Sequence, residues 1–96
     1  ELEQLIALNV DPTTISGFMN NIAMCYAEMK NTKMEEKYFL DAVKTDPANI
    51  NALNGLAAFY LKMGDNQKGK EYLDKLLKIK PDDAGARRKL DSLNKQ

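Results

Sequence analysis

The chain carries the same kind of helix stop twice, at an interval of 34 residues from Pro47 to Pro81. The first stop reads "VKTDPAN" and the second reads "LKIKPDD", and each follows a run in which apolar and charged residues are mixed. Proline has no N–H to donate to a helix and disfavours the α conformation in the residue before it. Two such stops at this interval indicate a repeated helical unit, which constrains the fold more than any other feature of the sequence.

Apolar residues recur at steps of three and four along most of the chain and never alternate cleanly, which predicts an all-α fold of about six helices. The expected helical runs are Leu2–Leu8, Ile15–Met29, Met34–Val43, Leu53–Leu61, Leu73–Ile79 and a last helix through Arg87, Leu90 and Leu93. Asn49 and either Asp82 or Asp83 are predicted N-caps. Gly64 is the predicted left-handed residue at a helix end.

The interval holds along the whole length of the unit. When residues 16–49 are laid over residues 50–83 without a gap, seven positions are identical. The identical pairs are Asn20/Asn54, Ala23/Ala57, Tyr26/Tyr60, Met29/Met63, Tyr38/Tyr72, Lys44/Lys78 and Pro47/Pro81. At the front of the chain, Ala7, Asp11 and Pro12 fall on Ala42, Asp46 and Pro47 at an offset of 35, as a partial third copy. A two-helix unit repeated in this way is typical of a stacked-helix solenoid.

These residues resemble the tetratricopeptide repeat, a helix–turn–helix of 34 residues. The second copy matches its pattern with Leu53, Leu56, Ala57, Tyr60, Gly69, Leu73, Leu76 and Pro81, and the first with Met19, Ile22, Ala23, Tyr26, Phe39, Ala42 and Pro47. The first copy departs from the pattern at Glu35, where a small residue lets the two helices touch, and at Lys30, where a turn glycine is usual. Glu35 therefore brings the helix crossing within that copy into question.

The resemblance implies a right-handed α-α superhelix of antiparallel helix hairpins. We expect one domain over residues 1–96, made of the end of a preceding repeat (1–14), two full repeats (16–49 and 50–83) and a capping or next-repeat helix (84–96). The segment Leu2–Leu8 would be the last helical part of the preceding repeat, and it is expected to end before Pro12.

The resemblance also implies a concave groove lined by the first helix of each repeat. Transferred position by position, the expected groove residues are Asn20, Met24, Ala27, Asn51, Asn54, Ala58, Leu61 and Arg88, with Gly17, Gly85 and Ser92 at further groove positions. The amides of Asn20 and Asn54 can donate to and accept from a peptide backbone, and Arg88 can bind a carboxylate. The alternative interpretation is that the asparagines are ordinary polar surface residues.

Some family members bind a C-terminal carboxylate with a particular set of Lys, Asn and Arg residues. Here Asn21, Gly55 and Lys89 stand at repeat position 6, and Met24 stands at position 9 of the first copy. The full set is absent, so capture of a chaperone tail is not predicted.

Other kinds of function find little support. The 14 basic and 14 acidic residues balance, which argues against nucleic acid as a partner. No apolar run approaches the roughly 20 residues that cross a bilayer, so membrane insertion is not expected. The chain has no histidine, and "GDNQKGKE" ends in Glu71 where a phosphate-binding loop needs Ser or Thr. No cofactor, metal or enzymatic activity is predicted.

The sulfur-containing residues are expected to be structural. Cys25 is the single cysteine, and we expect a buried thiol rather than a nucleophile because no base is available. Met19, Met24, Met29 and Met34 recur every five residues and are predicted to fill the core.

The predicted function is a protein–protein interaction module that holds a peptide segment or a partner helix. The alternative is a structural stretch of a longer solenoid that spaces other parts or self-associates into a homo-oligomer through its terminal helices.

Overall fold

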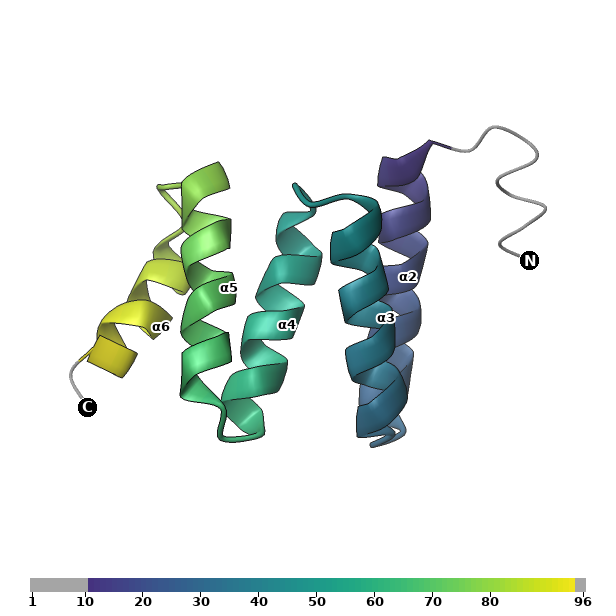
Figure 1. Ribbon diagram of the computed structural model, residues 1–96, viewed down its shortest axis with the longest axis horizontal. Helices are drawn as coiled ribbons and strands as arrows, with labels where there is room; N and C mark the ends of the chain where they lie inside the picture. The colour runs from purple at the N-terminus through teal and green to yellow at the C-terminus, as the bar shows by residue number, and fades with distance from the viewer. Residues whose placement is uncertain (1–10, 95–96) are drawn as a thin grey trace. The chain divides into compact units, whose positions relative to one another are not determined.

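The computed structural model describes residues 11–94, and every regular element in that range is an α-helix (Figure 1). The helices are α2 (Pro12–Glu28), α3 (Thr32–Thr45), α4 (Ile50–Lys62), α5 (Asn66–Ile79) and α6 (Ala84–Asn94). The predicted all-α class is confirmed. The expected helical segment Leu2–Leu8 lies outside the described residues. The chain divides into two compact units, Glu1–Ala52 and Leu53–Gln96, which we call the first and second units.

Each described helix begins at an aspartate or asparagine whose side chain accepts a hydrogen bond from the backbone N–H three residues ahead. These N-caps are Asp11, Asn31, Asn49, Asp65 and Asp83, with N···O distances of 2.8, 3.2, 3.0, 3.1 and 3.0 Å. Such caps satisfy one of the four N–H groups that a helix start leaves unpaired. The predicted caps at Asn49 and Asp83 are confirmed.

The start of α2 differs from the sequence prediction. The apolar pattern indicated a helix from Ile15, and Pro12 was considered only as the residue before which the segment Leu2–Leu8 ends. Instead, Pro12 is the first residue of α2 and Asp11 is its N-cap. Proline is well suited to the first helical position, where its missing N–H would have had no partner and its fixed φ is already helical. The same residue type thus ends one helix at Pro47 and begins another at Pro12.

In the first unit, α2 and α3 lie side by side as a hairpin (Figure 1). Its buried residues include Ile15, Ala23, Phe39 and Ala42. Lys30 makes the turn with φ of 59°, the left-handed conformation that Gly64 adopts with φ of 87°. Glu35, the residue that brought the helix crossing into question, is buried on the inner side of the hairpin with 4% exposure. The two helices therefore pack despite this departure from the repeat pattern.

In the second unit, α4 and α5 form the second hairpin, in which Leu61 lies against Gly69, and α5 also packs against α6. Its buried residues are Leu53, Leu56, Ala57, Phe59, Tyr60, Gly69, Leu73, Leu76 and Ala86. The rings of Tyr60 and Tyr72 stack with centroids 5.8 Å apart, and those of Tyr26 and Tyr38 in the first unit stack at 5.7 Å. The interplanar angles are 12° and 11°, so both units contain the same aromatic contact.

The prediction of buried sulfur-containing residues was wrong for Cys25, Met24 and Met29, whereas Met19 and Met34 are half-buried. Cys25 is exposed rather than buried, and Met24 and Met29 are 54% and 64% exposed rather than part of the core. Cys25 and Met29, the C-cap of α2, follow Phe18 by seven and eleven residues, so all three lie on one side of the helix. This side is not that of Ile15 and Ala23. Their apolar character alone did not indicate which face of the helix is buried.

Candidate functional site

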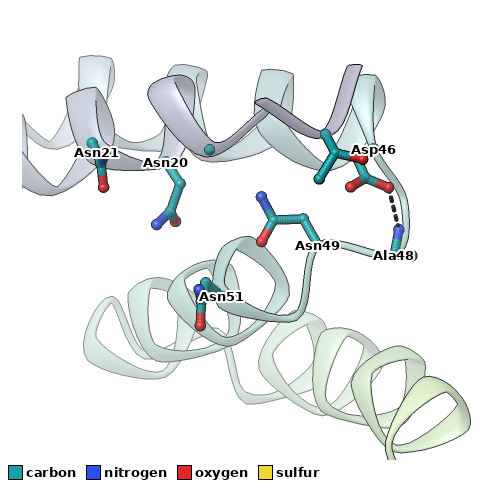
Figure 2. Close-up of a pocket in the computed structure, with 8 residues that line it drawn as sticks. Asn20, Asn21, Asp46, Ala48, Asn49 and Asn51 are labelled. Carbon is teal, nitrogen blue, oxygen red and sulfur yellow. Dashed lines mark hydrogen bonds between the residues drawn. The ribbon is translucent and has the colours of Figure 1, made fainter. Parts of the chain in front are cut away.

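The first unit carries an open polar hollow of about 420 Å³, which we call the asparagine hollow (Figure 2). It is lined by Thr13, Gly17, Asn20, Asn21, Asp46, Ala48, Asn49 and Asn51. These residues come from α2, from the turn between α3 and α4, and from the first turn of α4. The hollow brings together three residues expected in the groove, Gly17, Asn20 and Asn51, and adds an aspartate and two asparagines that were not expected there.

The turn side of the hollow is held by local hydrogen bonds. Asp46 Oδ1 accepts from the backbone N–H of Ala48 at 3.1 Å (Figure 2). This bond folds the chain into the short turn that contains Pro47, as aspartate commonly does when it bonds to the backbone two residues ahead. The carboxylate of Asp46 therefore has a defined place on the wall of the hollow.

Asn49 is fixed by bonds on both sides of its amide. Its Oδ1 caps α4, and its Nδ2 donates to Ser16 Oγ at 2.7 Å. The Ser16 hydroxyl in turn donates to the carbonyl of Ala42 at 2.6 Å and is fully buried. This chain of bonds links the start of α4 to both α2 and α3 within the first unit. Asn49 has little freedom left to reorient toward a ligand.

Asn20 is held far less firmly. Its side chain points from α2 into the space between α2 and the first turn of α4 (Figure 2), and the residue is only 8% exposed. Within residues 11–94, its Oδ1 is buried and accepts no hydrogen bond. Its Nδ2 has only the sulfur of Met24, at 3.8 Å, and a thioether is a weak acceptor. An unpaired buried polar group of this kind costs about 1–3 kcal/mol, so Asn20 is the least satisfied part of the hollow.

The second unit has a hollow of its own on α6, of about 440 Å³, which we call the basic hollow. It is lined by Gly85, Arg88, Lys89 and Ser92. Lys89 Nζ donates to Asn54 Oδ1 at 3.2 Å, which links α6 to α4 within this unit. Arg88 and Asn54, both expected in the groove, therefore lie at or next to this surface, together with the unpredicted Lys89.

Comparison with known families decides what the two hairpins are. Two family models described as tetratricopeptide repeat match the chain, one over residues 36–92 and the other over residues 16–49. The chain belongs to the tetratricopeptide repeat family. No curated protein matches it. Tetratricopeptide repeats are generally protein–protein interaction modules and are typically not catalytic.

The remaining predicted groove residues line neither hollow. Met24 and Ala58 are exposed, whereas Ala27 and Leu61 are half-buried. Ala27 and Leu61 occupy the same position of the tetratricopeptide repeat, and in the second unit Leu61 lies against Gly69 of the neighbouring helix. Leu61 therefore packs within its own hairpin, and a role of Ala27 and Leu61 in binding stays a prediction.

The residues missed by the repeat pattern belong to the turn. Asp46 and Asn49 were interpreted only as a helix stop and an N-cap, although both also line the asparagine hollow. Their polar type and their places on either side of Pro47 were the available signal, because turn side chains that bond locally still present one side to solvent. Lys89 was considered only for its place at repeat position 6, which alone does not make the carboxylate-binding set.

The described part of the chain shows neither a metal-binding cluster nor a membrane span. Within residues 11–94, no three His, Cys, Asp or Glu side chains gather closely enough to hold a metal ion. None of the helices over this range is long and apolar enough to span a bilayer. The two hollows are thus the candidate binding surfaces of the described chain.

Proposed function

We propose that the chain is a peptide-binding module in which each unit presents its own hollow to a segment of a partner protein. The observation that carries this proposal is the overlap between the expected groove and the hollows. Gly17, Asn20 and Asn51 line the asparagine hollow, and Gly85, Arg88 and Ser92 line the basic hollow. These positions were chosen from the repeat pattern alone, so their location at the hollows supports a role in binding.

The two hollows suit different chemistry. Primary amides both donate and accept, so Asn21 and Asn51 can pair with the N–H and C=O groups of an extended backbone. The guanidinium of Arg88 has five donors in a planar fork that matches a carboxylate. A bound segment would thus place main chain against the first hollow or an acidic group against the second.

The test begins by selecting peptides of 12 residues from a displayed random library on the full chain. Binding of the selected peptides is then measured by fluorescence polarisation to the Asn20→Ala, Asn51→Ala and Arg88→Ala variants. We expect at least one of these variants to lose about tenfold in affinity, because one charge-assisted hydrogen bond contributes roughly 1.5–3 kcal/mol and tenfold corresponds to about 1.4 kcal/mol.

The control is Lys70→Ala, an exposed residue of α5 that lines neither hollow. Its affinity should match that of the unchanged chain, and all variants should keep their helical circular dichroism. Failure to select any peptide, or equal affinity in every variant, would contradict the proposal. Either result would mean that the hollows take no part in peptide binding.

The alternative, a solenoid segment that self-associates, is favoured by the apolar face of α2. Phe18 and Met29 are 44% and 64% exposed on that face. Static light scattering of the full chain across a hundredfold concentration range separates the two functions. A mass that rises with concentration and falls back in the Phe18→Ser variant would support self-association, and a constant monomer mass would exclude it over that range.

A further inference from the structure

Asn20 and Asn54 occupy the same position of the two repeats but have different surroundings. Asn54 Oδ1 accepts from Lys89 Nζ at 3.2 Å, whereas Asn20 Oδ1 is buried and accepts nothing within the described residues. The residue that precedes Lys89 by the repeat length of 34 is Gly55, which has no side chain to donate. In sequence, therefore, the position equivalent to Lys89 in the helix after the first repeat holds a glycine.

The charge of the asparagine hollow also favours a lysine-like cation as its partner group. Asp46 is the only charged residue among those that line it, and no lysine or arginine of the described chain does so. Since the single charge among the lining residues is a carboxylate, the complement of the hollow is a cationic donor rather than an anion. The basic hollow, with Arg88 and Lys89, has the opposite preference.

The amide of Asn20 is able to meet a donor from the hollow. The χ2 torsion of asparagine is broad and roughly twofold, so the amide turns at little cost when nothing holds it. Its one hydrogen bond, from Nδ2 to the Met24 sulfur at 3.8 Å, is weak. By contrast, Asn49 is tied on both sides by bonds of 2.7 and 3.0 Å. Asn20 is thus the lining residue whose carbonyl gains most from a ligand.

We propose that the asparagine hollow binds the side-chain ammonium of a lysine in the partner peptide, with Asn20 Oδ1 as the accepting atom. Asp46 adds attraction through space. This inference rests on the proposed peptide-binding function and names the chemistry of one of its contacts. A partner lysine then donates to Asn20 Oδ1 as Lys89 donates to Asn54 Oδ1. The volume of about 420 Å³ lies within the range of ligand pockets, which begin near 300 Å³.

The experiment is an NMR titration of the full, isotope-labelled chain with four blocked pentapeptides, acetyl-Gly-Ser-X-Ser-Gly-amide. The central residue X is lysine, N-ε-acetyl-lysine, norleucine or glutamate, so the probes differ in charge and donors at one place. The reporters are the backbone amides of Gly17 and Asn51, which line the hollow and remain in every variant. We expect saturable shifts with the lysine probe in the millimolar range, and at least fivefold weaker binding of the other three.

Three variants assign the effect to the hollow. Asn20→Ala should abolish the preference for lysine, and Asn54→Ala, the matched change in the other repeat, should leave it unchanged. Asp46→Asn keeps an oxygen for the Ala48 N–H but removes the charge, so the lysine probe should bind several-fold more weakly. Raising the salt from 0.05 to 0.5 M should weaken lysine binding to the unchanged chain in the same direction, because an exposed charge is screened.

The outcomes separate this inference from the proposed function. If all four probes shift the reporters equally, or if displayed peptides bind while the lysine probe does not, peptide binding stands and the ammonium contact is overturned. A lysine preference that survives Asn20→Ala also overturns it. If no probe shifts the reporters and no peptide can be selected, both proposals fall.

Discussion

At one pair of equivalent positions, the two hairpins place the small and the large residue on opposite helices. In the first, Ala27 is small and Glu35 is large, whereas in the second the equivalent positions hold Leu61 and Gly69. A Cβ placed on Gly69 would overlap the side chain of Leu61 and lie 3.5 Å from the carbonyl of Ala57. Glu35 nevertheless packs with 4% exposure in the first hairpin. The small residue required between two helices of a repeat can therefore come from either helix.

The largest expected effect comes from placing the first hairpin's large residue in the second. Gly69→Glu should destabilise the chain by about 3 kcal/mol or more, because overpacking typically costs 1–3 kcal/mol and the carboxylate adds a cost of burial. Urea unfolding followed by circular dichroism measures this loss.

The matched control for that change is the double variant Leu61→Ala and Gly69→Glu, which copies the pair found in the first hairpin. It should recover part of the stability, with a coupling energy of about 1–3 kcal/mol, as is usual for residues in contact. Additive effects of the two changes would contradict the proposed compensation in size between positions 61 and 69.

The second effect concerns a contact that only the first repeat contains. Ser16→Ala removes the hydroxyl between Asn49 Nδ2 and the Ala42 carbonyl, and the equivalent residue in the second repeat is Ile50. Leaving these groups without a partner should cost about 1–3 kcal/mol. The loss is read from the urea midpoint, with Thr13→Ala on the same helix as a control near zero. A loss below about 0.5 kcal/mol would contradict the role assigned to the hydroxyl.

The features that were predicted correctly from the sequence all depend on short stretches of chain. Asn49 and Asp83 are caps, and Gly64 is left-handed, because an amide, a carboxylate and a missing Cβ determine local geometry wherever they occur. The spacing of apolar residues likewise sufficed for the class of fold.

What could not be predicted depends on pairs of residues or on the burial of one helix face. Glu35 is buried although the repeat pattern calls for a small residue there, and the small residue of this hairpin, Ala27, is on the other helix. A prediction made one position at a time does not reveal this exchange. The exposure of Cys25 and Met29 depends on which side of α2 meets α3. The start of α2 at Pro12 was missed because proline is suited both to following a helix and to beginning one.

A third, smaller effect compares the turns of the two hairpins. Lys30 and Gly64 are equivalent and both left-handed, with φ of 59° and 87°. Lys30→Gly should stabilise the chain by roughly 0.5–1 kcal/mol, because glycine adopts this conformation without steric cost. Gly64→Ala should destabilise it by about 1–2 kcal/mol through backbone strain alone, since nothing lies within 4 Å of the added Cβ. Thermal unfolding of both variants measures the two shifts, and equal signs would contradict the shared geometry.

The smallest effect tests whether Asn20 and Asn54 are equivalent in energy as well as in position. Asn54→Ala removes an exposed bond to Lys89, so it should cost no more than about 0.5 kcal/mol. Asn20→Ala removes a buried carbonyl that accepts nothing within the described residues, and the desolvation cost of that group disappears with it. The unliganded chain should therefore be unchanged or more stable after this change, although the residue is 8% exposed and most buried truncations destabilise. Differential scanning calorimetry of both variants measures the difference. A loss above about 1 kcal/mol for Asn20→Ala would mean that its amide supports the fold, because a group kept for a ligand contributes nothing until the ligand is bound.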